Sequence, residues 1–296
     1  MAITAALVKE LRERTSAGMM DCKKALTECD GDMDKAVTWL REKGIAKAAK
    51  KSGRIAAEGL TRIAVEGNRA VVVEVNSETD FVTKNDQFLA LLDMVANTIL
   101  NSSAKTNEEA LALDVDGATL ESKFIDATAT IGEKITLRRF EVIEKEDADT
   151  FGAYMHQGGK ISAVAVLKNT DNAEVAHDMA MQVASMTPSY ISRNHMPAEI
   201  VEKEREVQME IMKNDESLAG KPEKVLHGIV EGRLSKSLQE MCLVDQPFFK
   251  DPNQKCGAVL KAANTEVSVF VRYAAGEGLE KREENFAEEV AKQMGK

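Results

Sequence analysis

Aromatic side chains are scarce in this chain of 296 residues, where they make up 4% of the total. Hydrophobic residues nevertheless account for 44% and charged residues for 30%, which is typical of a globular protein and not of a disordered one. The core must therefore be built from aliphatic side chains and methionine. A chain of this length is expected to form two or three domains, with ample material for a core.

Cysteine is also rare, and no Cys-x-x-Cys pair occurs among Cys22, Cys29, Cys242 and Cys256. No tight group of cysteine and histidine indicates a zinc site. We therefore expect reduced thiols that pack as small hydrophobic side chains, as in a cytoplasmic protein. The sequence predicts no signal peptide, and no apolar run approaches the roughly 20 residues of a membrane span.

Catalytic and nucleotide-binding motifs are absent as well. The sequence contains no Gly-x-x-x-x-Gly-Lys-Ser/Thr phosphate loop, no Gly-x-Ser-x-Gly elbow and no His-Glu-x-x-His. The four histidines are scattered, and no pair of carboxylates stands out from the acidic background. An enzyme is therefore the weaker hypothesis, and we predict no catalytic residues, no cofactor and no bound metal.

Basic residues are outnumbered, 39 against 49 acidic ones, which gives a net charge of −10. Such a chain is not expected to bind nucleic acid directly, because phosphate contacts need clustered lysine and arginine. One basic segment, residues 43–54, is compatible with an RNA-binding tail. A solvated linker between domains is the preferred interpretation, because no aromatic residues are interleaved with its charges.

Residues 3–43 are predicted to form three short helices, since apolar residues recur in each at helical spacing. The pattern resembles a ubiquitin-associated (UBA) three-helix module. Packing explains most of its apolar residues. Met19 and Met20 are less well explained by packing, because two flexible thioethers beside a glycine suit an adaptable contact surface. Residues 1–54, which include the basic segment, are therefore predicted to be an N-terminal domain.

A pattern of two strands, a helix and a further strand occurs twice in the rest of the chain. The first copy is predicted over residues 55–145, with a hairpin over 60–75 and a helix over 86–100. The second is predicted over residues 146–280, with its last strand at 267–273. We interpret the two copies as a duplicated α+β core, because each half is small for an independent domain.

Two long helices interrupt the second copy at about residues 197–245. A polar turn over 214–222 joins them, which predicts an antiparallel coiled-coil hairpin with arms on the order of 25 Å long. We expect the hairpin to project from the body, and the alternative is that it packs flat on the domain. The last segment, residues 281–296, is predicted to be a C-terminal helical module.

The most informative stretch connects the second strand of the first copy to the helix over 86–100. Residues 79–82, Thr-Asp-Phe-Val, fall on this connection and place an aromatic ring beside a carboxylate on a loop. One interpretation is that Phe81 folds back into its own core and Asp80 makes a turn. The other is that Phe81 enters a partner's pocket, since large aromatic side chains are common interface anchors.

Several stretches together resemble the bacterial elongation factor Ts family. They are residues 11–15 (Leu-Arg-Glu-Arg-Thr), 21–26 (Asp-Cys-Lys-Lys-Ala-Leu), 74–82 (Glu-Val-Asn-Ser-Glu-Thr-Asp-Phe-Val), and 154–156 (Tyr-Met-His) followed by 159–161 (Gly-Lys-Ile). The resemblance covers nearly the full length, and the hairpin and C-terminal module are similar to the proteobacterial type. It implies a cytoplasmic guanine nucleotide exchange factor for elongation factor Tu in translation elongation, with no covalent chemistry.

The resemblance also implies roles for particular residues. One loop would intrude on the partner GTPase near its Mg²⁺ site, with Phe81 as an apolar wedge and Asp80 as the polar group beside it. That loop consists of Thr79, Asp80, Phe81, Val82, Thr83 and Lys84. The other partner-binding residues would be Arg12, Met19, Met20, Lys23 and His156. The hairpin and the C-terminal helix would extend the contact to further domains of the partner, and no membrane would be involved.

Two other functions account for parts of the sequence. A UBA-type interaction module on an unrelated scaffold predicts that residues 1–43 alone bind the partner, but it leaves the loop over 74–82 unexplained. An RNA-binding or ribosome-associated protein is favoured only by the segment 43–54, and it predicts binding that falls steeply with salt.

Overall fold

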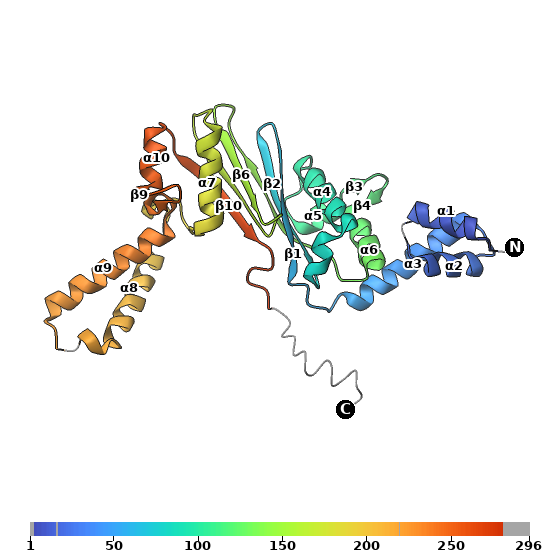
Figure 1. The fold of residues 1–296 in the computed structure, drawn as a ribbon, viewed down its shortest axis with the longest axis horizontal. Helices are drawn as coiled ribbons and strands as arrows, with labels where there is room; N and C mark the ends of the chain where they lie inside the picture. The colour runs from blue at the N-terminus through green and yellow to red at the C-terminus, as the bar shows by residue number, and fades with distance from the viewer. Residues whose placement is uncertain (1–2, 16, 219, 281–296) are drawn as a thin grey trace.

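The computed structural model describes residues 3–15, 17–218 and 220–280, and it is an α+β protein as the sequence predicts (Figure 1). The longer helices are α1 (Ala5–Thr15), α2 (Met19–Glu28), α3 (Met33–Lys51), α4 (Asp86–Leu100), α6 (Leu120–Ile131), α7 (Ala173–Met186), α8 (Ala198–Lys213) and α9 (Glu223–Met241). The main strands are β1 (Glu58–Glu66), β2 (Arg69–Ser77), β5 (Thr136–Glu144), β6 (Thr150–His156), β7 (Ile161–Leu167) and β10 (Val267–Ala274). Shorter elements are α5 (Asn107–Leu111), β3 (Asp114–Val115), β4 (Ala118–Thr119), β8 (Pro247–Phe248), β9 (Asp251–Lys255) and α10 (Cys256–Ala262).

The predicted order of strand, strand, helix and strand is observed twice, as β1, β2, α4, β5 and as β6, β7, α7, β10. Each set of strands forms its own antiparallel sheet, in the order β1-β2-β5 or β10-β7-β6. The second strand of each hairpin is therefore central in both sheets. Glu66 pairs with Arg69, so Gly67 and Asn68 form a two-residue turn within the hairpin that the sequence predicts over residues 60–75.

The two sheets lie face to face, and helices cover the outer face of each (Figure 1). Successive side chains of a strand point to opposite faces. In β2, Val71, Val73 and Val75 therefore pack with α4 and α6, whereas Ala70 and Val72 pack with the second sheet. Strand β2 is thus buried on both faces, which explains its nearly continuous apolar run. On the far side of the second sheet, α7 and α10 complete the core.

Glu74 interrupts the apolar run of β2, and its side chain is fully buried. Arg138 Nη1 donates to one carboxylate oxygen at 2.8 Å, and Arg139 Nε donates to the other at 2.6 Å. The backbone N–H of Gly276 donates to the same carboxylate at 2.7 Å. The Arg139 guanidinium also lies 4.1 Å from the centroid of the Tyr273 ring. One buried carboxylate therefore joins β2 to β5 and to the segment that follows β10.

The end of the N-terminal helical module differs from the sequence prediction. Helix α3 continues beyond residue 43 to Lys51, although most of residues 43–51 are exposed, as a solvated linker would be. Gly44 is buried against α6, where an added Cβ would lie 3.4 Å from the Ala129 side chain. Arg41 donates to Ser122 Oγ on the same helix at 3.3 Å. Alanine and lysine are strong helix formers, and the contact with α6 explains why the helix extends so far.

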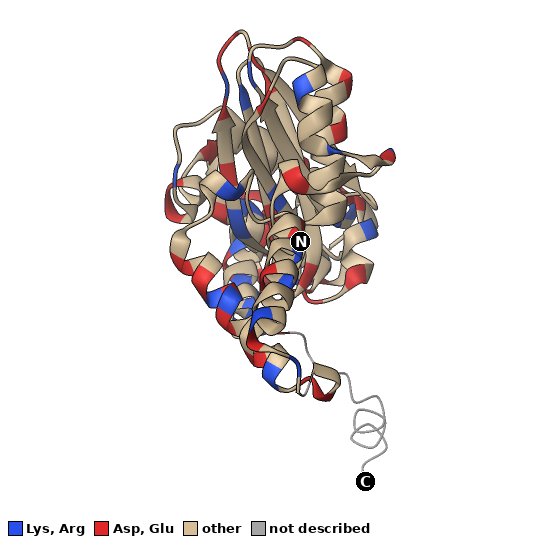
Figure 2. Ribbon diagram, turned by 90° about the vertical axis from the view of Figure 1, so that its left-hand side faces the viewer, with Lys and Arg blue, Asp and Glu red and all other residues tan. Residues whose placement is uncertain are grey.

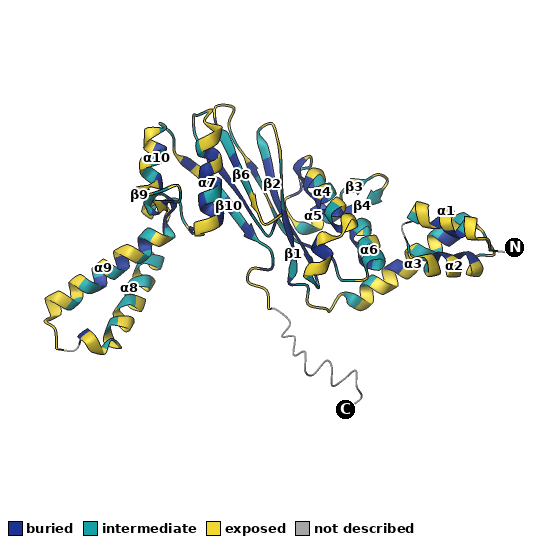
Figure 3. Cartoon of the chain, viewed as in Figure 1, coloured by how far each residue is buried: buried dark blue, intermediate teal, exposed yellow. Residues whose placement is uncertain are grey.

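Helices α8 and α9 form the predicted hairpin, which projects from the two sheets in Figure 1. Val230, Leu234 and Leu238 of α9 are buried, whereas no residue of α8, all of which the structure describes, is buried. Figure 3 shows exposed residues along both helices. In the described part of the chain, no helix is long and apolar enough to cross a membrane. The predicted C-terminal module, residues 281–296, lies outside the described residues.

Replacing Glu74 tests the ion pairs that join β2 to β5. Glu74→Ala removes the shared partner of two guanidinium groups, so we expect the free energy of unfolding to fall by about 3 kcal/mol. Urea unfolding measures this loss. The matched control is Glu144→Ala, which removes an exposed carboxylate that lies 3.4 Å from Arg69 in the same sheet. Its expected cost is below about 1 kcal/mol, and equal losses in the two variants would contradict the role given to Glu74.

Candidate functional site

The connection between β2 and α4 carries an exposed phenylalanine. Residues Asp80–Lys84 form one turn of 3-10 helix, η1. The Phe81 side chain is 82% exposed, whereas Val82 is 5% and Thr83 is 9% exposed. The ring therefore lies on the surface, while its two following neighbours anchor the turn to the core. Of the two interpretations of Phe81, the structure supports the one in which the ring is free to meet a partner.

Short-range hydrogen bonds explain why the chain turns at this point. Ser77 Oγ donates to the carbonyl of Thr79 at 2.9 Å, and Thr83 Oγ1 donates to the carbonyl of Asp80 at 2.6 Å. Asn85 then caps α4, because its side-chain oxygen accepts the backbone N–H of Gln87 at 2.8 Å. Asp80 and Lys84 are exposed at the two ends of the turn.

Two glutamates hold the base of the turn, and sequence reasoning missed one of them. Glu133 accepts both the backbone N–H and the hydroxyl of Thr79, at 2.8 and 2.6 Å. Glu78 accepts the backbone N–H of Lys134 at 2.6 Å and lies 3.2 Å from Arg54 Nη1. Glu78 belongs to the motif that carries the family resemblance. Glu133 is 54 positions from Thr79 and belongs to no sequence pattern, so only its place in the fold identifies it.

The predicted contact residues of the N-terminal module lie together. Met19 and Met20, at the start of α2, are 57% and 75% exposed. With Arg12 of α1 and Lys23 of α2 they line a groove of about 890 Å³, which Gln87 of α4 also lines. The structure therefore brings these four residues onto one surface. That surface extends to the helix that follows the Phe81 turn.

His156 lies elsewhere, at the exposed end of β6 in the second sheet. Its Nδ1 is 2.9 Å from the hydroxyl of Tyr154. The turn that follows His156 is fastened to the first sheet, because the backbone N–H and the hydroxyl of Thr61 both donate to the carbonyl of Gly159 at 2.7 Å. The second sheet thus presents His156 from a position that is fixed relative to β1.

One comparison with known proteins decides the family. The family model described as elongation factor TS matches residues 78–277, which is more than half of the chain. The chain belongs to the elongation factor Ts family. Membership implies a nucleotide exchange factor for elongation factor Tu in translation elongation, which is a non-catalytic role. The matched region begins one residue before Thr79 and includes the Phe81 turn, Glu133 and His156.

Three of the cysteines of this elongation factor Ts chain, Cys22, Cys242 and Cys256, are buried. Burial raises the pKa values of Cys22 and Cys242, and it raises the pKa of Cys256 to about 12. All four cysteines are free, in agreement with the sequence prediction of reduced thiols. Among the described residues, no group of three or more His, Cys, Asp or Glu side chains is placed to hold a metal ion.

The basic segment near the end of α3 is partly neutralised by acidic neighbours. Lys47 Nζ lies 2.9 Å from Asp21, and Arg54 lies 3.2 Å from Glu78. Lys51 Nζ donates to the carbonyl of Gly132. Elsewhere in the molecule, Figure 2 shows lysine and arginine interspersed with aspartate and glutamate over the helices that face the viewer. The contacts of Lys51 and Arg54 thus join the end of α3 and the residues after it to the first copy, whereas that of Lys47 lies within the N-terminal module.

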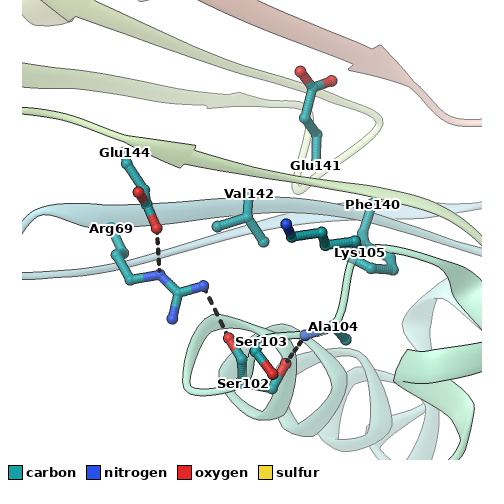
Figure 4. Close-up of a pocket in the computed structure, with 9 residues that line it drawn as sticks. All are labelled: Arg69, Ser102, Ser103, Ala104, Lys105, Phe140, Glu141, Val142 and Glu144. Carbon is teal, nitrogen blue, oxygen red and sulfur yellow. Dashed lines mark hydrogen bonds and ion pairs between the residues drawn. The ribbon is translucent and has the colours of Figure 1, made fainter.

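A further groove of about 680 Å³ lies between β5 and residues 102–105 (Figure 4). Arg69 spans it, with Nη2 donating to the carbonyl of Ser102 at 2.9 Å and Nε 3.4 Å from Glu144. Its lining residues are different from the predicted site residues. The groove is therefore separate from the predicted site.

Truncating the two methionines tests whether the groove on the N-terminal module binds the partner. Met19→Ala combined with Met20→Ala removes exposed apolar surface, so we expect the Kd for elongation factor Tu to rise about tenfold. Isothermal titration measures the change. The matched control is Ile45→Ala, which truncates an apolar side chain of α3 that is 49% exposed and lies outside the groove. Wild-type affinity in the double variant would contradict the assignment.

Proposed function

We propose that the chain releases GDP from elongation factor Tu by pressing the Phe81 turn against the Mg²⁺ and phosphate site of that GTPase. The observation that supports this most strongly is the 82% exposure of a phenylalanine whose two following neighbours are buried. An exposed apolar ring gains free energy only when a partner removes it from water. A turn anchored in this way presents the ring with little loss of conformational freedom on binding.

The free energy needed to loosen the bound nucleotide is larger than the burial of Phe81 alone would supply. Loosening a nucleotide from about nanomolar to about micromolar affinity requires ~4 kcal/mol of coupling. Burying one phenylalanine side chain contributes about 1.5–3 kcal/mol. The remainder would come from the broader interface, to which the groove on the N-terminal module, His156 and the helical hairpin contribute.

The chemistry of magnesium makes a small displacement sufficient. Mg²⁺ requires nearly ideal octahedral geometry with ligands at about 2.0–2.1 Å. Moving the ligands by about an ångström removes most of the energy with which they bind Mg²⁺, and the phosphates of the nucleotide then lose their counter-charge. Phe81 would act as the wedge, with Asp80 as the polar group beside it. No proton transfer and no covalent step is needed.

The predicted site residues fall into three groups in this mechanism. Thr79, Val82 and Thr83 would support the turn from within, and Asp80, Phe81 and Lys84 would face the partner. Arg12, Met19, Met20, Lys23 and His156 would hold the GTPase domain while the turn acts. The exchange would take place in the cytoplasm, where translation elongation occurs.

Replacing Phe81 tests the wedge. Phe81→Ala removes about 1.5–3 kcal/mol of burial in the complex, so we expect elongation factor Tu to release GDP about 10- to 100-fold more slowly at saturating exchange factor. Stopped-flow release of a fluorescent GDP measures the rate. The affinity of the two proteins should change much less. Phe81→Leu keeps an apolar side chain and should lose less activity, and unchanged release by the alanine variant would remove Phe81 from the mechanism.

Linkage provides a separate test of the exchange function. A factor that weakens GDP binding must itself be weakened by GDP to the same extent. We expect the immobilised chain to retain nucleotide-free elongation factor Tu and to lose it when excess GDP is added. Retention that does not depend on GDP would contradict nucleotide exchange, while it would leave a simple binding role intact.

A further inference from the structure

The segment of residues 132–134, within the connection between α6 and β5, lies beside the base of the Phe81 turn. Its central residue, Glu133, uses both carboxylate oxygens on one residue of the turn's base. Oε2 accepts the backbone N–H of Thr79 at 2.8 Å, and Oε1 accepts the Thr79 hydroxyl at 2.6 Å. Charge-assisted hydrogen bonds are stronger than neutral ones, and a pair of them also fixes orientation.

Thr79 is the residue from which the 3-10 turn starts. Its backbone is extended, with φ −126° and ψ 159°. A threonine at this position commonly caps the following turn with its own hydroxyl. Here the hydroxyl is directed to Glu133, so the bond that orients Thr79 comes from a distant part of the chain. The direction in which the turn leaves β2 therefore depends on this carboxylate.

The same connection also holds the end of α3. Gly132 terminates α6 in a left-handed conformation, with φ 91°, and so brings Glu133 out of the helix. Lys134 Nζ donates to the carbonyls of Ser52 and Arg54 at 2.6 and 2.9 Å. The connection 132–134 is thus bonded both to the Phe81 turn and to the helix that carries the N-terminal module.

We propose that Glu133 is a positioning residue for nucleotide exchange, which acts by holding Thr79 so that Phe81 is presented in one orientation. This inference rests on the proposed function of the Phe81 turn. Without Glu133 the turn samples more conformations, and the ring must be ordered when the partner binds. Ordering a flexible segment weakens the binding that it contributes, so exchange slows while the groove around Met19 and Met20 still binds the partner.

A double-mutant cycle with Phe81→Ala separates this role from general support of the fold. We expect Glu133→Ala to slow release of fluorescent GDP about 3- to 10-fold in the wild-type background. In the Phe81→Ala background the same change should slow release by less than about twofold, since the ring that Glu133 orients is gone. Equal slowing in the two backgrounds, or no slowing in the wild type, would overturn the proposal.

If the Glu133→Ala variant does not fold, two variants that remove fewer hydrogen-bonding groups allow the same double-mutant test. Glu133→Gln retains one acceptor and Thr79→Val removes only the hydroxyl donor, so each should slow release less than Glu133→Ala but show the same dependence on Phe81. The matched control is Glu121→Ala, which removes an exposed carboxylate from α6 and should leave release unchanged. A loss of the same size at Glu121 would show a non-specific effect of charge and would overturn the role of Glu133.

Hydrogen exchange on the free chain distinguishes a failure of this proposal from a failure of the proposed function. In Glu133→Ala we expect faster amide exchange over residues 79–84, and unchanged exchange over α7. Unchanged exchange over residues 79–84 would overturn the positioning role even if the wild type releases GDP. A wild-type chain that did not speed GDP release would overturn the exchange function and Glu133's part in it, whatever hydrogen exchange showed.

Discussion

Burial of β2 on both faces is the constraint on which the rest of the structure depends. Three valines of this strand pack with helices, and the alternate residues pack with the second sheet. A shift of one residue in its pairing would exchange these two sets, so the register is strongly specified. Glu74 further specifies the register of β2, because only one register places its carboxylate against Arg138 and Arg139. The register therefore fixes the position of the C-terminal end of β2, after which the Phe81 turn begins.

The Phe81 turn and the surface around Met19 and Met20 differ in how firmly their side chains are held. Phe81 stands on a turn that is anchored by the buried Val82 and Thr83 and by two glutamates at its base. Met19 and Met20 are unbranched and exposed, so they adapt to the shape of what they meet. In the proposed mechanism, the anchored Phe81 turn would disturb the partner's metal site, and the adaptable methionines would hold the partner. This division agrees with the exchange role that membership of the elongation factor Ts family implies.

Patterns within a few residues of each other were predicted well from the sequence. The hairpin predicted over residues 60–75 and the helix predicted over 86–100 are both observed, with Gly67 in the hairpin turn and Asn85 as the helix cap. Features that depend on distant partners were not predicted. The basic segment after residue 43 has no apolar stripe, yet it is helical because α3 packs on α6. Glu133 has no neighbouring motif, and its importance follows from a contact across 54 positions.

The sequence by itself determined the order of the elements and the position of an aromatic ring on the connection after β2. These properties follow from local periodicity, capping and turn chemistry, which act over a few residues. Only the tertiary structure decided that Phe81 faces solvent while Val82, its neighbour, faces the core. That choice depends on how one turn of 3-10 helix is oriented, and the contacts at its base include hydrogen bonds to Glu133, which the sequence places 54 positions after Thr79.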